Sequence, residues 1–335
     1  MRVLVTGGAG YIGSHACKAI ALAGHEPIAY DDLRTGHAWS VRWGPLVVGD
    51  IADQDLMKRT LRDHRVDVVM HFAASSNVGE AVTRPDLYYR NNVGGTLAML
   101  EAMRAASIDR LILSSSCAVY GVPEVSPLRE TTDRRPINAY GRSKKMVEAI
   151  VEDFAAAFGL GAIALRYFNA SGADPDGELG EEHDPETHLI PLVLQAALGL
   201  RRHISIFGTD YPTRDGTCIR DYVHVSDLAA AHVKALDALE SGTVKAINLG
   251  SQNGHSVLEV LDTARRVTDR PIPSLVAPRR PGDPPELFSC TDRARSVLGW
   301  DAATSRLETA IESTWAWMTE HRARYFDQTA LEAGR

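Results

Sequence analysis

The feature that most constrains this chain is a glycine-rich turn between a short strand and a helix. Val3 to Thr6 is an apolar, β-branched run typical of a buried parallel strand, and helical spacing follows over Ile12 to Leu22. Glycines stand between them at positions 7, 10 and 13. Gly7 permits a tight turn, Gly10 lets backbone N–H groups approach a pyrophosphate, and Gly13 lets the helix pack on the sheet. The pattern predicts a dinucleotide-binding βαβ unit.

An acidic residue stands where the second strand is expected to end. Asp31 follows Gly13 by 18 residues. A carboxylate at this place accepts hydrogen bonds from a ribose diol and repels a 2′-phosphate, so NAD is favoured over NADP. Arg34 lies three residues further on, and its cation keeps the NADP alternative open.

Strand-like and helix-like segments alternate through the first half. Further strands are expected at Pro27–Tyr30, Leu46–Val48, Val66–Phe72, Leu111–Ser115 and Ala162–Phe168, and helices at about Asp53–His64, Pro85–Ala106 and Asn138–Phe158. This alternation predicts an α/β fold with a Rossmann-type doubly wound parallel sheet. The second half is less regular. We expect an NAD-binding domain over 1–168 and a smaller mixed α/β substrate domain over 169–335, with some segments returning to the first sheet.

Composition excludes several classes of protein. The 335 residues carry 36 basic and 43 acidic side chains, a net charge of −7, which argues against a nucleic-acid binder. The four cysteines form no C-x-x-C pair and are expected to be free thiols in a reducing compartment. No targeting segment and no apolar run near the ~20 residues of a membrane span are present, so we expect a cytoplasmic protein without a membrane partner.

The sequence gives no strong metal-binding pattern. The histidines form no H-E-x-x-H motif and no Cys/His cluster, so no metal site is expected. Seven of the thirteen residues from Asp174 to Glu186 are acidic, without the spacing of an EF-hand. A metal-binding loop and a solvated surface loop are both conceivable, and the missing spacing favours the solvated loop.

A tyrosine and a lysine stand four residues apart, at Tyr140 and Lys144. On a helix these positions share a face. A phenol with its ordinary pKa near 10 is a poor base, and bringing that pKa to about 7 requires about 4 kcal/mol from a neighbouring ammonium and a positive nicotinamide. Ser116 stands at an expected strand end, where ligands bind in open α/β sheets, and can hydrogen-bond the same substrate oxygen. The three residues predict an acid–base site.

Motifs along nearly the whole chain resemble the UDP-glucose 4-epimerase (UDP-galactose 4-epimerase) family of the extended short-chain dehydrogenase/reductase superfamily. The motifs that carry this resemblance are Val3–His15, Val69–Glu80, Asn91–Val93, Ser114–Gly121, Tyr140–Lys144, Leu165–Asn169, Ile206–Asp227 and Ala277–Asp283. The last two of them are much more specific to the family than the first.

The resemblance implies three sets of site residues. Ser116, Tyr140 and Lys144 are the implied catalytic residues. The implied cofactor contacts are Gly7, Gly10, Tyr11, Ile12, Gly13, Asp31, Asp50, Ile51, Phe72, Ala73, Ala74, Asn91, Ser114, Tyr140, Lys144 and Tyr167. The implied substrate contacts are Ser116, Tyr140, Asn169, His188, Leu189, Phe207, Arg220, Arg280, Asp283 and Leu287, with Asn169 and the two arginines at the diphosphate, Phe207 at the uracil and Asp283 at the ribose.

The implied activity is NAD-dependent C4 epimerisation of a UDP-sugar, UDP-glucose or UDP-galactose, in galactose metabolism. Tyr140 takes the proton of the sugar 4-hydroxyl while C4 gives a hydride to NAD. The resulting 4-keto sugar rotates in the site while its UDP stays anchored. The hydride then returns to the opposite face of C4. The net reaction is redox-neutral, so NAD is expected to stay bound.

Other activities share this fold. Dehydratases and decarboxylases typically carry an acid directly after the Ser/Thr of the strand end, whereas Ser116 is followed by Cys117. A net reductase usually exchanges NADP. A catalytically idle NAD-binding regulator is a hypothesis of another class, and the intact Ser116, Tyr140 and Lys144 argue against it.

The sequence departs from the family pattern at three places, one of which is a pair of residues. Ser76 replaces a lysine that contacts the cofactor in many hexose epimerases, and Thr187-His188 replaces a pair of asparagines. Leu287 stands where a bulky tyrosine excludes N-acetyl sugars and a small residue admits them. UDP-hexoses, UDP-N-acetylhexosamines and UDP-pentoses therefore all stay open as substrates.

The family generally forms homodimers through the two long helices of the cofactor domain. The side chains that could provide an apolar dimer face are Leu97, Ala98, Met99, Met146, Ile150 and Phe154, although the core could equally use them.

Overall fold

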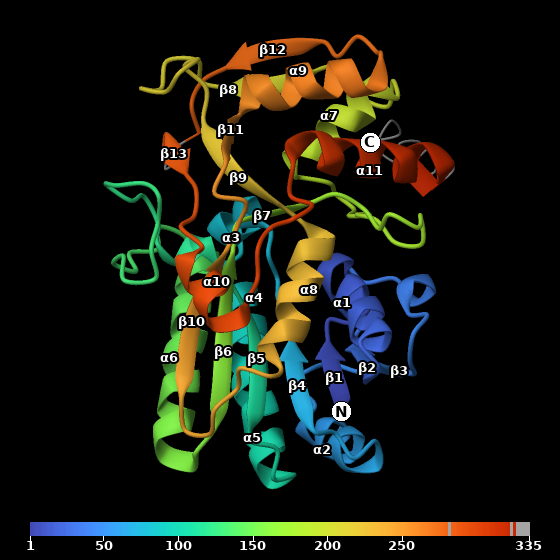
Figure 1. Ribbon diagram of the computed structural model, residues 1–335, viewed down its shortest axis with the longest axis vertical. Helices are drawn as coiled ribbons and strands as arrows, with labels where there is room; N and C mark the ends of the chain where they lie inside the picture. Colours follow the sequence, from blue (N-terminus) through green and yellow to red (C-terminus); the bar gives the residue numbers. More distant parts are fainter. Residues whose placement is uncertain (281–282, 322–323, 326–335) are drawn as a thin grey trace.

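A seven-stranded sheet organises the larger part of the molecule, in the computed structural model that describes residues 1–280, 283–321 and 324–325 (Figure 1). Every neighbouring pair is parallel, in the order β10-β6-β5-β4-β1-β2-β3. The strands are β1 (Arg2–Thr6), β2 (Glu26–Asp31), β3 (Leu46–Val48), β4 (Val68–His71), β5 (Arg110–Ser116), β6 (Gly161–Tyr167) and β10 (Val244–Leu249).

Helices cover both faces of this sheet because its strands are apolar on both sides. Val3 and Val5 pack with α1 (Tyr11–Leu22), α8 (Val225–Ala235) and α10 (Asp292–Leu298). Leu4 points to the other face, which α2 (Gln54–Asp63), α5 (Thr96–Ala105) and α6 (Ala139–Phe158) cover. The predicted α/β fold with a doubly wound parallel sheet is confirmed.

Short strands and three helices build the smaller part at the top of Figure 1. In one sheet β9 (Ile219–His224) pairs with β7 (Asn169–Ser171), β11 (Gly254–Ser256) and β13 (Glu286–Leu287). A second sheet pairs β8 (Ile204–Phe207) with β12 (Ser274–Ala277). An apolar core joins α7 (Leu189–Ala197), α9 (Val257–Thr268) and α11 (Leu307–Glu320). The remaining short elements are η1 (Ala38–Ser40), α3 (Val78–Thr83) and η3 (Cys117–Val119).

The expected helix over Pro85–Ala106 is confirmed as one helical run, but its middle is wound more widely than an α-helix. The segment divides into α4 (Pro85–Tyr88), the π-helical turn η2 (Tyr89–Gly95) and α5. Gly95 packs so closely that a Cβ there would lie 2.7 Å from the Ile51 side chain. Wide turns of this kind often occur at functional sites, and η2 carries one predicted cofactor contact, Asn91.

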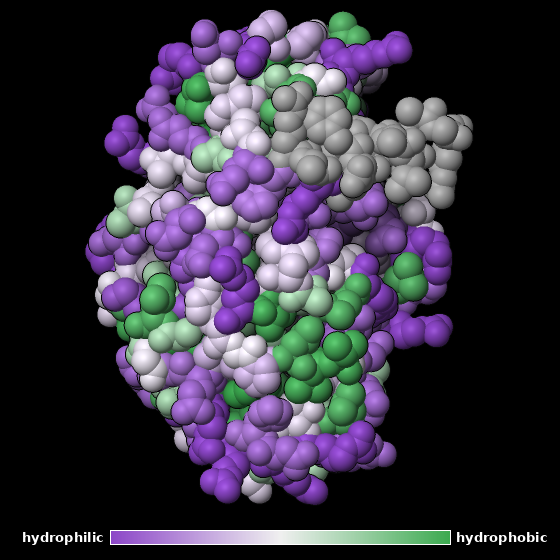
Figure 2. Space-filling model, turned by 90° about the vertical axis from the view of Figure 1, so that its right-hand side faces the viewer, coloured by the Kyte–Doolittle hydropathy of each residue, from purple (hydrophilic) through white to green (hydrophobic). Residues whose placement is uncertain are grey.

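The strand order reverses between β1 and β4, which is the place where open α/β sheets bind ligands. Among the described residues no helix is both long and apolar enough to cross a membrane. Figure 2 shows a largely hydrophilic face with a gathering of hydrophobic residues in its lower half, at the level of the seven-stranded sheet. All four cysteines are free and buried.

Candidate active site

The glycine turn forms a cradle between β1 and α1. Gly7 has a φ of +72°, and a Cβ there would lie 2.7 Å from the backbone nitrogen of Ala73. A Cβ at Gly13 would lie 2.0 Å from the carbonyl oxygen of Gly7, so α1 reaches the turn only because this residue is glycine. Gly10 is the N-cap of α1, and no side chain in the described structure caps that end. The first-turn N–H groups, which include those of Tyr11 and Ile12, therefore fit a dinucleotide's pyrophosphate.

Asp31 connects this cradle to the end of β2. Its buried carboxylate accepts the N–H groups of Ala9 at 3.0 Å and Leu33 at 2.9 Å, and burial raises its pKa. Each oxygen keeps acceptor capacity for a ribose diol. Arg34 is engaged by the carboxylate of Asp32 at 2.5 Å, so the cation that would favour a 2′-phosphate is already neutralised.

Residues after β3 and β4 border the same edge of the sheet. Ile51 is buried, and the hydroxyl of Tyr30 donates to the carbonyl oxygen of Asp50 at 2.9 Å. The N–H groups of Phe72 and Ala73 donate to the carbonyl oxygen of Thr6 at 2.9 and 3.1 Å. These bonds hold the chain after β4, which continues with Ala74, close against the glycine turn.

Two asparagines of η2 connect this edge to α6. Asn91 donates to the hydroxyl of Ser75 at 3.3 Å and accepts from Arg34 at 3.0 Å. Asn92 is buried, accepts the N–H of Ser75 at 2.8 Å and donates to the hydroxyl of Ser143 at 3.0 Å. Sequence reasoning missed Asn92, although it stands inside the quoted motif over 91–93.

The predicted catalytic residues come together at the carboxyl end of β5. Asn138 caps α6 by accepting the N–H of Gly141 at 2.8 Å, which places Tyr140 in the first turn of the helix. Tyr140 is buried beside Ser116. Burial raises the pKa of Tyr140 well above its ordinary value, and its hydrogen bond with Ser116 offsets only part of that rise. A phenolate at Tyr140 is therefore favoured only by positive charge close to it.

Lys144 lies one turn further along α6. Its Nζ donates to the carbonyl oxygen of Ser114 at 2.8 Å and lies 6.0 Å from the centre of the Tyr140 ring. The hydroxyls of Ser114 and Tyr167 are 2.6 Å apart. Burial lowers the pKa of Lys144 to about 8, against the opposing effect of the Glu148 charge. Lys144 and the Tyr140 ring therefore face one another within the range of a cation–π contact.

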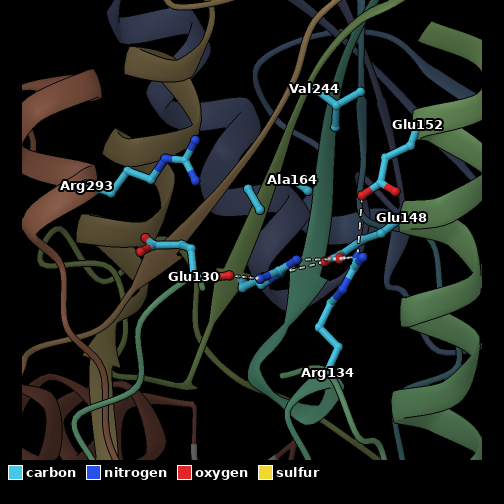
Figure 3. Close-up of a pocket in the computed structure, with 9 residues that line it drawn as sticks. Glu130, Arg134, Glu148, Glu152, Ala164, Val244 and Arg293 are labelled. Atoms are coloured by element: carbon cyan, nitrogen blue, oxygen red, sulfur yellow. Dashed lines mark hydrogen bonds and ion pairs between the residues drawn. The ribbon is translucent and has the colours of Figure 1, made fainter. Parts of the chain in front are cut away.

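A buried ion-pair network joins α6 to β5 and β6 and so supports this arrangement. Glu148 of α6 accepts from Ser115 of β5 at 2.6 Å and from Arg166 of β6 at 2.9 and 2.7 Å. Arg134 adds a second cation at 2.8 Å and also contacts Glu152, as the dashed lines in Figure 3 show. The adjoining cavity of about 260 Å³ is lined largely by these paired charges. The network fixes the helix that carries Tyr140 and Lys144 against the strands that carry Ser116 and Tyr167.

The smaller part gathers the predicted UDP-binding residues. Arg220 of β9 lies 3.4 Å from the carboxylate of Asp283, whose other oxygen accepts from Arg280 at 2.8 Å. The Arg280 guanidinium stands 5.0 Å from the Phe207 ring. Two arginines with an aromatic ring suit a diphosphate beside a base. Pro281 and Gly282 of the same motif lie outside the described residues.

Two further predicted contacts flank β9. Asn169 begins β7 opposite Tyr222, and Leu287 of β13 lies opposite Arg220. Leu287 also packs against the apolar group that contains Cys117. The structure therefore brings Leu287 to the strand that presents Arg220.

His188 differs most from the expectation of a substrate-side residue. It is the N-cap of α7, and its Nδ1 lies 2.9 Å from a carboxylate oxygen of both Glu181 and Glu186. Burial lowers the pKa of His188, but the two carboxylates have the larger effect and raise this pKa well above its ordinary value. Leu189 packs against the apolar core of the smaller part.

The acidic segment from Asp174 to Glu186 is only in part the solvated loop that its composition predicts: Asp176 is 70% exposed, but other carboxylates are buried. The side chains of Glu181 and Glu186 are only 3% and 5% exposed, and that of Asp174 is 5% exposed. Asp174 contacts the buried ammonium of Lys18 at 2.8 Å. The sequence signal that could have pointed to this Glu/His group is the alternation Glu181, His183, Glu186, His188, although it says nothing about burial.

Comparisons with known proteins agree with this geometry. The sequence model of the NAD dependent epimerase/dehydratase family matches residues 3–250. The UDP-glucose 4-epimerase of Rhizobium meliloti (strain 1021) is 49% identical over 317 residues, 94% of this chain and 96% of that protein. The structure of UDP-glucose 4-epimerase from Brucella ovis in complex with NAD has a TM-score of 0.91 at 49% identity, covering 94% of this chain and 97% of that one. The enzyme from Stenotrophomonas maltophila, with bound NAD and formylated UDP-arabinopyranose, has a TM-score of 0.93 at 39% identity, covering 96% and 99%.

Proposed function

The chain belongs to the NAD dependent epimerase/dehydratase family, and from this premise we propose that it is an NAD-dependent 4-epimerase of UDP-sugars that interconverts UDP-glucose and UDP-galactose. The observation that carries the proposal is the convergence of Ser116, Tyr140 and Lys144 beside the glycine cradle. Such a group can remove and return one hydroxyl proton.

The chain's own residues divide the work of the reaction. Ser116 holds the 4-hydroxyl against Tyr140, whose phenolate takes the proton and later gives it back. Lys144 stabilises that phenolate by its charge and stays fixed by its bond to Ser114. NAD, when bound, supplies the nicotinamide that accepts and returns a hydride at C4. Lys144 favours the phenolate by its charge, against the burial of Tyr140, and a bound nicotinamide would add to that charge.

The cradle and the arginines hold the two nucleotides apart. Gly7, Gly10 and Gly13 leave the first turn of α1 open to the NAD pyrophosphate, and Asp31 receives the ribose. Arg220 and Arg280 hold the diphosphate of the UDP-sugar, which keeps the anchor in place while the 4-keto sugar turns over. This division supports an NAD-binding domain over 1–168 and a UDP-sugar-binding domain over 169–335, with β10 contributed to the first sheet.

The range of substrates depends on Leu287. Its position opposite Arg220 supports a role in limiting the space beside the sugar. The test is conversion of UDP-galactose, UDP-N-acetylgalactosamine and UDP-arabinopyranose by wild type and Leu287→Tyr, followed by anion-exchange chromatography. We expect wild type to convert UDP-galactose and the variant to lose turnover of the N-acetyl sugar selectively. Conversion of none of the three by NAD-loaded wild type would refute the proposed activity.

The oligomeric state that fits this function is a homodimer through α5 and α6. Leu97 and Met146 are 38% and 44% exposed on these helices, which supports an apolar contact between two copies. Met99 is fully buried in the core, which is the other of the two uses that the sequence left open for it, and is not available for this contact. The free cysteines support a cytoplasmic location.

A further inference from the structure

Four potential metal ligands converge in the segment between β7 and α7. One ligand atom from each of Glu181, His183, Glu186 and His188 lies within 4.8 Å of the corresponding atom of the other three. The Nδ1 atom of His188 lies 2.9 Å from both glutamates, and that of His183 lies 3.2 Å from Glu181 and 3.6 Å from Glu186. A tetrahedral ion with bonds of about 2.0–2.2 Å separates its ligands by about 3.4 Å. The observed spacings bracket that value.

The orientation of His183 points to a shared centre. Its Nδ1 is buried and finds no hydrogen-bond partner among the described residues, although two carboxylate oxygens lie within 3.6 Å. In an ion pair the N–H is directed at a carboxylate oxygen, whereas ligands of one ion direct their lone pairs at a point between them. The misaligned approach of His183 fits the second arrangement.

The charge and burial of the group also suit a cation. The side chains of Glu181 and Glu186 are almost fully buried, and two carboxylates that close repel unless positive charge lies between them. Two protonated imidazoles, or one divalent ion with two neutral imidazoles, both make the group electrically neutral. The neighbouring carboxylates of Asp174, Asp176 and Glu178 instead surround the ammonium of Lys18 at 2.7–2.9 Å.

We propose that Glu181, His183, Glu186 and His188 bind one divalent transition-metal ion, for which Zn²⁺ is the best fit. Two imidazole nitrogens and two carboxylate oxygens match the ligand set and the four-coordinate geometry of Zn²⁺. Ca²⁺ and Mg²⁺ prefer six or more oxygen ligands, so the two histidines disfavour them.

The ion would connect the cofactor cradle to the substrate-binding part. The His183 ring meets the ring of Tyr11 edge-on at 6.2 Å, and Tyr11 follows the N-cap of α1 directly. The hydroxyl of Tyr11 donates to the carbonyl oxygen of Gly172, which follows β7. His188 is itself the N-cap of α7. Four protein ligands leave no open position, which is typical of a structural ion. This role is separate from the proposed epimerisation and does not depend on it.

The test measures metal directly on the full chain. Wild type is stripped with a chelator and titrated with Zn²⁺ and with Co²⁺, whose visible absorption reports tetrahedral coordination. We expect one ion per chain, an intense tetrahedral Co²⁺ spectrum and a higher thermal midpoint with Zn²⁺. His183→Ala should abolish stoichiometric binding. His255→Ala is the matched control, since His255 also lies beside a glutamate, Glu259 at 3.8 Å, but outside the group.

X-ray absorption of Zn²⁺-loaded wild type gives a readout that needs no variant. We expect a first shell of nitrogen and oxygen only, with the scattering of two imidazoles. A folded wild type that binds no Zn²⁺ at micromolar concentration overturns the proposal, as does binding that survives in His183→Ala. A six-coordinate oxygen shell does the same, because it indicates adventitious surface binding.

Discussion

The Nζ atom of Lys144 donates a hydrogen bond to the carbonyl oxygen of Ser114 at 2.8 Å and lies 6.0 Å from the centre of the Tyr140 ring. This hydrogen bond holds the lysine on the strand that ends in Ser116. Its ammonium remains close to the Tyr140 ring. Burial raises the pKa of Tyr140 and so disfavours its phenolate. Positive charge close to the phenol acts in the opposite direction and makes Tyr140 a better base.

Replacing the hydroxyl of Tyr140 tests its role as the acid–base group. Tyr140→Phe should lower kcat for UDP-galactose by about 10³-fold, the range of general acid–base catalysis. Binding of UDP, measured by calorimetry, should stay unchanged because Arg220 and Asp283 are untouched. Wild-type turnover in this variant would contradict the assignment.

The buried carboxylate of Glu148 should be essential for stability. Glu148→Gln leaves Arg166 buried without its charge partner and should lower the free energy of unfolding by about 3–5 kcal/mol. Glu152→Gln is the control, since Glu152 is 49% exposed and contacts the same Arg134 nitrogen at a longer distance of 3.4 Å, so its loss should cost less than about 1 kcal/mol. Urea denaturation compares the two variants. Equal losses would disprove the special importance of the buried pair.

A side chain at Gly13 should disrupt the cofactor cradle. In Gly13→Ala the new Cβ meets the carbonyl oxygen of Gly7, so α1 must move, at a cost of about 2 kcal/mol. We expect the purified variant to retain much less NAD, measured after release by heat. In Gly94→Ala the nearest atom is 3.9 Å away, so this variant should retain NAD like wild type. Full NAD content in Gly13→Ala would argue against the cradle.

Buried neutral histidines should make the fold sensitive to acid. Burial lowers the pKa of His232 to about 4, whereas the unfolded chain binds this proton from about pH 6.5 downward. The unfolded state therefore binds more protons, and stability that is complete above pH 6.5 is lost as the pH falls toward 4. Each such histidine contributes about 1.4 kcal/mol per pH unit in this window. Burial lowers the pKa of His15 and His71 in the same sense.

Removing one of these histidines should flatten the pH dependence. Between about pH 6 and about pH 5, His232→Leu should reduce the slope of unfolding free energy against pH by about 1.4 kcal/mol per unit. The same change at the exposed His203 should leave the slope as in wild type. Identical slopes for all three proteins would show that His232 does not titrate as its burial requires.

The part of the fold that follows local periodicity could be predicted from the sequence. The strand before Gly7, the helix after it and the long helix that starts near Asn138 all have their ends encoded in nearby residues. The π-helical turn η2 could not be predicted, because it depends on the packing of Gly95 against Ile51, 44 positions earlier in the sequence. The short strands around β9 pair over long distances and carry little local signal.

The same distinction applies to the candidate site: residues in local motifs could be predicted, whereas residues placed by distant contacts could not. Ser116, Tyr140 and Lys144 stand in motifs whose spacing carries their chemistry, so their proximity could be foreseen. The burial of Glu181 and His183 could not, because an acidic segment rich in glycine and proline has the composition of a solvated loop. Its contacts with Tyr11, far away in sequence, make it part of the interior.

The proposed epimerisation is tested most directly with UDP-galactose carrying deuterium at C4, incubated with purified protein without added NAD and followed by proton NMR. We expect UDP-glucose that keeps its deuterium at C4, because the hydride leaves and returns within one protein-bound cycle. Absence of conversion even after NAD is added, or exchange of the deuterium with solvent, would contradict it.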